Sequence, residues 1–234
     1  MSVVLYRSSF QSLQSKRVDD ALSKESKVLT YKGGEKRPPA SSLGKKHANM
    51  YEEGGSTVHI SVIGWKEGQD VTEADGCAIA VETNTRRKKG LTILSVSGKK
   101  GQGRILSGEK GKTEGFANPY ACIALHRLVE KATRRHRSLT VSVDPDAPCS
   151  RLYDSQYERE ETKRRYWNSL ELIYVTVGFT LTRIRPDGYT PRLVSSLINR
   201  AELYRRLRNG IFYVKRGGDG KWSLANDYID ITLD

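Results

Sequence analysis

The chain has 234 residues, with 40 Lys and Arg against 27 Asp and Glu, which gives a formal net charge of +13. Such a charge attracts polyanions, although a basic surface that is merely solvated would give the same composition. Three widely spaced cysteines, Cys77, Cys122 and Cys149, form no Cys-x-x-Cys pair, which argues against a disulfide framework or a zinc site and favours a reducing compartment. Neither a secretory signal nor an apolar stretch approaching the ~18 residues of a membrane span is visible. We therefore expect a soluble cytoplasmic or nuclear protein that does not contact a membrane.

The first 56 residues read as a separate N-terminal segment. Val3–Tyr6 has β-strand character, and apolar residues at helix-compatible spacing follow it up to Leu22. Gly, Pro, Ser and charged residues dominate residues 32–56, which predicts an exposed loop. The sequence thus divides into residues 1–56, a strand and helix with a flexible basic loop, and residues 57–234, an α/β domain.

Three strands are predicted next. Residues 57–63, 77–82 and 91–96 alternate or are continuously apolar over strand-like lengths. Turn-forming residues at Glu67-Gly68 and Lys89-Gly90 separate them. This pattern is typical of an antiparallel meander.

The middle of the chain changes from strand to helix periodicity. Six glycines and four lysines in residues 98–115 predict a long flexible loop. Asn118-Pro119 is a typical helix start, with Asn as the cap and Pro at the first helical position, and this helix should end at Arg134-Arg135. Residues 139–143 predict a short buried strand that stops at Asp144-Pro145.

The C-terminal part continues the alternation of helices and strands. The expected elements are a helix from about Gln156 that Gly178 ends, a strand at 179–184, a helix from Thr190-Pro191 to Asn209-Gly210, and closing strands at 211–214 and 228–233. Strands that alternate with helices in this way indicate a layered α/β sheet.

One segment resembles a known family. Asn168, Tyr174 and the Gly178-Phe179 pair are similar to the Asn, Tyr-x-x-x-Gly-Phe pattern at the end of the last core helix of the GNAT superfamily of N-acetyltransferases, although Asn168 lies one residue closer to the Tyr than usual. The order of elements over residues 57–185 is also similar to that family. The resemblance implies an α/β fold with a GNAT-like mixed central sheet flanked by helices. A core aromatic and a glycine that ends a helix would produce the same local pattern.

The resemblance also implies a reaction, the transfer of an acyl group from acetyl-CoA to an amine. Tyr174 would be the general acid that protonates the leaving thiolate, and Asn168 would help to hold the pantetheine arm. Asp144, directly after a strand, would be the base that accepts a proton from the amine, although Asp144-Pro145-Asp146 is also ordinary turn chemistry.

The family holds the pyrophosphate of coenzyme A on a Gly-rich turn between a strand and a helix. Gly101, Gly103 and Arg104 are the matching candidates here. Gly98 departs from the pattern, because Gln or Arg is expected there, and a good helix begins only at Asn118. Three alternatives follow: the pyrophosphate loop carries an insertion, the anion site lies at the helix start near residues 117–121, or coenzyme A does not bind.

A second function is compatible with the same sequence. Basic clusters recur along the chain, and two of them adjoin aromatic residues, which suits phosphate contacts and base stacking as well as solvated helix faces. The clusters are Arg86–Lys89, Lys99-Lys100, Arg134–Arg137, Lys163–Arg165 and Arg205-Arg206. The hypotheses are therefore an N-acyltransferase acting on an amine of an acidic or nucleic-acid-associated substrate, and a non-enzymatic nucleic-acid-binding protein of a ribonucleoprotein or virus. Cys122 and His126 share a helix face but have no partners at metal-ligand spacing, so no metal is expected.

Overall fold

The computed structural model describes residues 2–53, 55–85, 88–109, 112–135, 139–143, 172–185, 188–193, 197–209, 214–216 and 221–224. Its helices are α1 (Ser2–Ser23), α2 (Lys45–Glu52), the short 3-10 helix η1 (Val71–Glu73), α3 (Pro119–Arg135) and α6 (Arg200–Asn209). Residues 172–177 are also helical. None of the helices in this described part of the chain combines the length and the apolar character needed to cross a membrane.

The strands form one large sheet and one hairpin. The strands of the first half are β1 (Ser26–Tyr31), β2 (Val58–Ile63), β3 (Gly76–Thr85), β4 (Lys88–Gly98), β5 (Arg104–Glu109) and β6 (Lys112–Phe116). Those of the second half are β7 (Leu139–Val143), β8 (Phe179–Arg185), β9 (Gly188–Leu193), β10 (Val214–Arg216) and β11 (Lys221–Leu224). The chain therefore folds as a mixed α/β protein.

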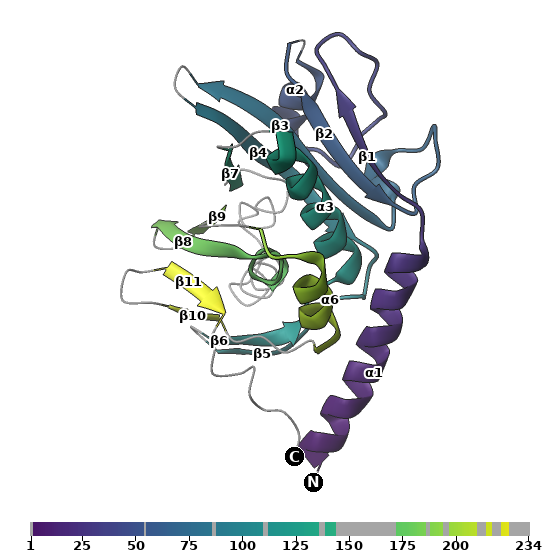
Figure 1. The fold of residues 1–234 in the computed structure, drawn as a ribbon, viewed down its shortest axis with the longest axis vertical. Helices are drawn as coiled ribbons and strands as arrows, with labels where there is room; N and C mark the ends of the chain where they lie inside the picture. The colour runs from purple at the N-terminus through teal and green to yellow at the C-terminus, as the bar shows by residue number, and fades with distance from the viewer. Residues whose placement is uncertain are drawn as a thin grey trace.

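The sheet order is β1-β2-β3-β4-β7-β9-β8-β11-β10, and β5 and β6 pair separately (Figure 1). β1 to β4 are antiparallel neighbours, which confirms the predicted meander. β7 lies parallel to β4, and α3 makes the crossover between them. A parallel pair needs such a crossover, because its two strands begin at the same edge of the sheet.

Both faces of the meander are buried. The alternation of side chains places Ile63, Ala78 and Ala80 on the face that α3 covers, where they pack with Leu125 and Leu128 in one core. A second core on the opposite face contains the other side chains of the same strands, with Leu43 and Tyr51 from the segment around α2. β2 is buried along its whole length, as a strand between two cores requires.

The helices α1, α3 and α6 form a layer on one face of the sheet (Figure 1). Val18 and Ala21 of α1, together with Leu203 and Leu207 of α6, are buried in the same core as α3. The predicted helix up to Leu22 is thus confirmed.

The prediction for the N-terminal segment is wrong in three details. Val3–Tyr6 lies within α1 instead of forming a strand, because a helix propagates through residues of modest β-preference when good helix formers follow. The strand in this segment is β1, which pairs with β2 at the edge of the large sheet. Residues 45–52 of the predicted loop form α2, whose His47 and Tyr51 are buried against the sheet.

Further predictions are wrong at turns. Lys89-Gly90 pairs inside β4 and does not form a turn. The predicted flexible loop at 98–115 contains the β5–β6 hairpin, in which Glu109 pairs with Lys112. Pro191 lies in β9, and the last helix begins only at Arg200.

The predicted start of α3 and the predicted stop at Gly178 are confirmed, and the bounds of α3 and β7 agree with the prediction over the described residues. α3 starts after Asn118 and ends at Arg135, β7 spans the expected five residues, and the helix at 172–177 ends at Gly178, whose φ is +107°. Positive φ favours glycine at this position. The expected helix from Gln156 to residue 171 and the expected strand at 228–233 lie outside the described residues.

Candidate functional site

The candidate site lies where β4 ends and α3 begins. In open α/β sheets, ligands bind beyond the carboxyl ends of parallel strands. The paired part of β4 and β7 ends with Ile93 opposite Val143, and β4 continues for five further residues to Gly98. Over the described residues, β4 therefore extends beyond its last pair with β7 toward the start of α3.

A glycine-rich loop, residues 99–103, follows β4. Lys99 donates its backbone N–H to the carbonyl of Asp75 at 2.6 Å, and Gln102 donates to the carbonyl of Lys99 at 3.4 Å. Gly101 has a φ of +73° and open space around the position that a Cβ would occupy. Within the part of the chain that the structure describes, no group accepts a hydrogen bond from the amides of Gly101 and Gly103. The loop thus presents two free N–H donors, and because both belong to glycines, no side chain of these residues obstructs them.

Asn118 connects this loop to α3. Its Oδ1 accepts hydrogen bonds from the amides of Tyr120 at 3.1 Å and Ala121 at 3.3 Å, and its Nδ2 donates to the carbonyl of Lys99 at 2.9 Å. A Cβ on Gly98 would come within 2.4 Å of Asn118 Oδ1. The chain therefore returns after the β5–β6 hairpin to the place where it left. The loop and the helix start are adjacent in space, although Gly103 and Asn118 lie 15 positions apart in the sequence.

Two acidic and two basic side chains surround the start of α3. The Tyr120 hydroxyl donates a hydrogen bond to Asp20, and the Lys24 ammonium donates to Asp75. Lys24 and Lys99 lie 5.9 and 5.8 Å from the centre of the Tyr120 ring. Cations near the negative face of an aromatic ring are attracted to it.

These contacts shift the pKa of three groups. Burial, followed by the hydrogen bond to Asp20, raises the pKa of Tyr120. The hydrogen bond from Tyr120 lowers the pKa of Asp20, and the hydrogen bond to Asp75 raises the pKa of Lys24. At neutral pH Tyr120 is therefore neutral, while Asp20 and Lys24 are charged.

α1 lies across this end of α3. Gln14 is 1% exposed and donates to the carbonyl of Ala117 at 2.9 Å, and Arg17 donates to the carbonyl of Gln102 at 3.3 Å. Together with Asp20, these residues recur at helical spacing along one face of α1, and Lys24 follows directly after the helix. That face fixes the position of the loop at 99–103.

The structure brings together part of the predicted site. Gly103 lies beside the start of α3, Gly101 lies two residues before it in the same loop, and Arg104 is the first residue of β5. Tyr174 lies in the helix at 172–177, is 3% exposed in the core that α3 covers, and meets the edge of the Phe179 ring at 5.5 Å. The other two predicted residues, Asp144 and Asn168, lie outside the described residues.

Sequence reasoning missed the residues that come from far along the chain. The hydrogen bond between Asp20 and Tyr120 joins residues 100 positions apart. A polar cluster across three strands was missed as well: His59, fully buried, bonds Thr30 Oγ1 at 3.1 Å through Nδ1 and Glu82 at 2.7 Å through Nε2. The signal for this cluster was a histidine within a strand of mostly apolar residues.

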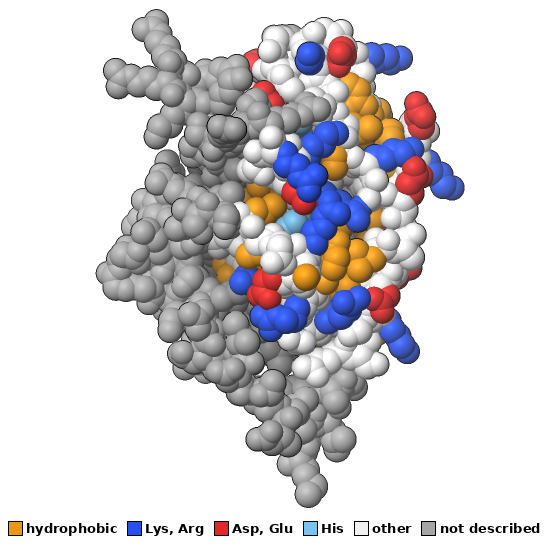
Figure 2. Space-filling view, in the orientation of Figure 1, with side chains coloured by type: hydrophobic (Ala, Val, Ile, Leu, Met, Phe, Trp, Pro, Cys, Tyr) orange, Lys and Arg blue, Asp and Glu red, His pale blue; other side chains and the backbone are white. Residues whose placement is uncertain are grey.

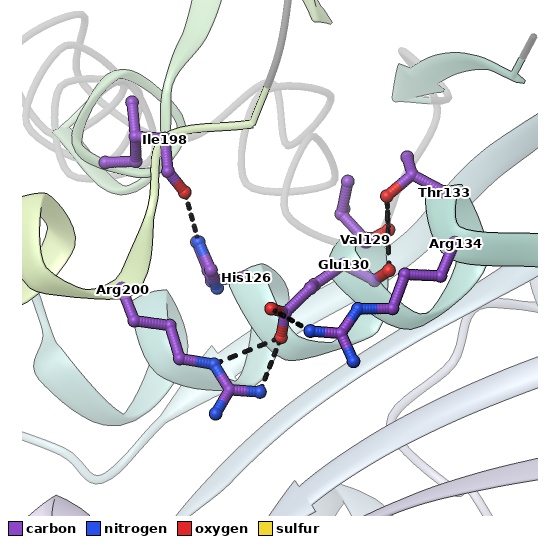
Figure 3. A network of polar contacts seen from close by, with 7 residues as sticks. All are labelled: His126, Val129, Glu130, Thr133, Arg134, Ile198 and Arg200. Atoms are coloured by element: carbon purple, nitrogen blue, oxygen red, sulfur yellow. Dashed lines mark hydrogen bonds and ion pairs between the residues drawn. The ribbon is translucent and has the colours of Figure 1, made fainter. Parts of the chain in front are cut away.

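A second network joins the middle of α3 to the segment that leads into α6 (Figure 3). His126, 2% exposed, bonds the carbonyl of Ile198 at 2.6 Å. Glu130 accepts hydrogen bonds from Arg134 at 2.9 Å and from Arg200 at 2.7 Å. Burial would raise the pKa of Glu130, but the hydrogen bond and charge of Arg200 outweigh it and lower that pKa.

Cys122 of α3 packs inside the core. Cys122 is buried and its Sγ lies 3.9 Å from the carbonyl of Ile173, and burial raises the pKa of its thiol. No group of three or more His, Cys, Asp or Glu side chains within the described ranges is arranged to hold a metal ion.

A hollow of about 510 Å³ lies on the opposite side of the sheet, between α2 and the segment that precedes it. Arg37 stacks 5.7 Å from the centre of the Tyr51 ring there, and the Tyr51 hydroxyl donates to the carbonyl of Pro38 at 2.6 Å. These contacts hold the segment against α2, and the hollow is separate from the site at α3.

The comparisons with known proteins give no relatives. No protein-family model, no curated protein and no solved structure matches the chain.

Proposed function

We propose that the protein is an acetyl-CoA-dependent N-acyltransferase with a GNAT-like fold, which acts on an amine of an acidic or nucleic-acid-associated substrate. The observation that carries the proposal is the parallel pair of β4 and β7, joined by α3, in which β4 runs past the last pair into a loop with free amides. The family that the sequence resembles admits its cofactor between two neighbouring parallel strands. The order of meander, helix, parallel strand, helix and strand supports the same assignment.

The loop at 99–103 fits a diphosphate better than the start of α3 does. The amides of Gly101 and Gly103 are free among the described residues, and Lys99 and Arg17 lie at the same loop. Backbone N–H groups of a turn with one residue at positive φ can line an anion-binding concavity, and the Gly101 and Gly103 amides flank Gln102 in such a turn. The first-turn amides of α3 already donate to Asn118. These contacts favour the alternative in which the pyrophosphate loop carries an insertion, and the β5–β6 hairpin is that insertion.

The other candidate residues take the roles that acyl transfer from acetyl-CoA requires. The thioester of acetyl-CoA supplies the activated acyl group. In this proposal the Gly101 and Gly103 amides, with Arg104, hold the diphosphate, and Asn168 holds the pantetheine arm. Tyr174 donates its hydroxyl proton to the departing sulfur, while Asp144 takes the proton of the amine.

The experiment is turnover with Tyr174→Phe. Acetyl-CoA is mixed with an acceptor panel of spermidine, glucosamine and a lysine-containing peptide, and released thiol is measured. Loss of a general acid lowers turnover by about 10²- to 10⁴-fold. Acetyl-CoA affinity should stay within about twofold, because Phe keeps the ring that packs on Phe179.

Tyr51→Phe is the matched control, since it removes a buried tyrosine hydroxyl on the opposite side of the sheet. It should leave turnover unchanged. Equal turnover by wild type and Tyr174→Phe would reject the role of Tyr174. The absence of thiol release from wild type with every acceptor, together with an absence of acetyl-CoA binding, would reject the enzyme.

A further inference from the structure

The layer of α1, α3 and α6 carries a dense basic surface. Nine Lys or Arg stand against four Asp or Glu among the side chains described on these three helices. The basic residues are Lys16, Arg17, Arg127, Lys131, Arg134, Arg200, Arg205, Arg206 and Arg208. Figure 2 shows Lys and Arg side chains gathered over this face with few acidic ones between them. We call this set the helical basic face.

Two carboxylates on this face each hold two guanidinium groups. Glu130 of α3 is bonded to Arg134 and Arg200. Glu202 of α6 is bonded to Arg205 at 2.7 Å and to Arg206 at 2.6 Å. The hydrogen bond from Arg205 and the charges of both arginines lower the pKa of Glu202 to about 2, so the carboxylate is charged and each group of three keeps a net positive charge.

The shared carboxylates also fix the guanidinium groups. An arginine held by a carboxylate has lost much of its side-chain freedom already, so less is lost when it binds a second anion. The outer member of each group remains open to solvent: the side chains of Arg134 and Arg205 are 72% and 43% exposed. Each therefore has free N–H donors that point away from its carboxylate, in the planar fork that suits phosphate oxygens.

We infer that the helical basic face binds the phosphodiester backbone of a nucleic acid. The basic groups are spread over three helices instead of converging on one point, which fits a row of phosphates better than a single phosphate ligand. Acidic protein surfaces offer carboxylates without that regular repeat. Backbone contacts carry no sequence information, so RNA and DNA of any sequence should bind. This inference is independent of acyl transfer.

The experiment is fluorescence anisotropy with labelled 20-mers of single-stranded RNA, single-stranded DNA and poly-glutamate, over a salt series. The variant is Arg134→Gln with Arg205→Gln. Glu130 keeps Arg200 and Glu202 keeps Arg206 in this variant, so neither carboxylate loses its last partner. The matched control is Lys36→Gln with Lys45→Gln, two exposed residues in the segment around α2 with the same change of charge.

Wild type should bind both nucleic acids, with log affinity falling against log salt at a slope of about −0.7 per phosphate contacted. The double variant should lower that slope by about 1.4 and weaken binding by about 30-fold near 50 mM salt, while the control changes affinity by less than about threefold. Three results would overturn the inference: no binding of either nucleic acid at low salt, equal losses in variant and control, or binding of poly-glutamate as tight as that of the nucleic acids.

Discussion

The two halves of α3 differ in how their polar groups are satisfied. In the second half, His126 and Glu130 have hydrogen-bonding partners from the segment around α6. At the start, Asn118 accepts a hydrogen bond from the amide of Tyr120 in the first turn of the helix. In the adjacent loop, however, the amides of Gly101 and Gly103 have no acceptor among the described residues. These two residues are exposed, so their amides can donate to a bound anion, and this is the end of α3 where we expect the ligand. The second half of α3 is thus held by hydrogen bonds to the segment around α6, whereas the donors beside its start are available for binding a ligand.

The largest effect is expected where β3 passes beneath the start of α3. A Cβ on Gly76 would lie 2.6 Å from the carbonyl oxygen and 2.9 Å from the carbonyl carbon of Tyr120. Backbone atoms cannot move aside easily, so Gly76→Ala should lower the free energy of unfolding by about 2–4 kcal/mol in urea denaturation. Gly68→Ala, at a φ of +88° in open space, should cost about 1 kcal/mol. Equal losses in the two variants would show that α3 does not depend on this close contact.

Substitution of Asn118 tests whether the loop at 99–103 or the start of α3 binds the diphosphate. Asn118→Gly removes the side chain that caps α3 and should lower the free energy of unfolding by a few tenths to about 1 kcal/mol, because glycine still tolerates the cap conformation. Acetyl-CoA affinity should change by less than about twofold if the loop amides hold the diphosphate. An affinity gain of tenfold or more, measured by calorimetry, would instead assign the anion to the freed amides of Tyr120 and Ala121.

His126, in the second half of α3, should make the stability of the fold depend on pH. Burial lowers the pKa of His126 below its usual 6.5, more than the hydrogen bond to Ile198 raises it. The unfolded chain therefore binds a proton near pH 6.5 that the folded chain does not, and stability falls as the pH drops from 6.5 to the folded-state pKa. The slope from one such group is at most about 1.4 kcal/mol per pH unit.

His126→Gln, which keeps an N–H donor for the carbonyl of Ile198, should flatten the pH profile in that window. Urea denaturation of both proteins between pH 5 and 8 measures the difference. Parallel profiles for wild type and variant would assign the slope to other groups.

Substitution of Glu130 should have a smaller effect on stability than substitution of Gly76. Glu130→Gln removes the charge that Arg134 and Arg200 share, but both arginines are more than half exposed and return to water. A loss of about 0.5–1 kcal/mol is expected, which shrinks at 0.5 M salt. Glu52→Gln, at an exposed residue of α2, should change stability by less than about 0.3 kcal/mol. A Glu130→Gln effect no larger than this would show that the network does not stabilise α3.

The meander and the start of α3 could be predicted because their signals are local. Strand alternation and the Asn118-Pro119 cap each involve neighbouring residues, and both appear in the structure. The β5–β6 hairpin was hidden by its glycines, which suggest flexibility when their pairing partners are unknown. The Asp20–Tyr120 contact depends on how α1 docks, which no local pattern records. The sequence thus predicted Gly101 and Gly103 as candidates but did not show that the loop lies beside α3.

The central claim is that the loop at 99–103 holds the diphosphate of acetyl-CoA. Isothermal titration of acetyl-CoA should be done with wild type, Gly101→Val and Gly68→Val. Both glycines have positive φ and open space, so the two variants carry the same backbone strain, about 1–2 kcal/mol. The account predicts binding by wild type and Gly68→Val, and a loss of at least tenfold in affinity for Gly101→Val. No heat of binding with wild type at millimolar acetyl-CoA, or equal affinity in all three proteins, would contradict it.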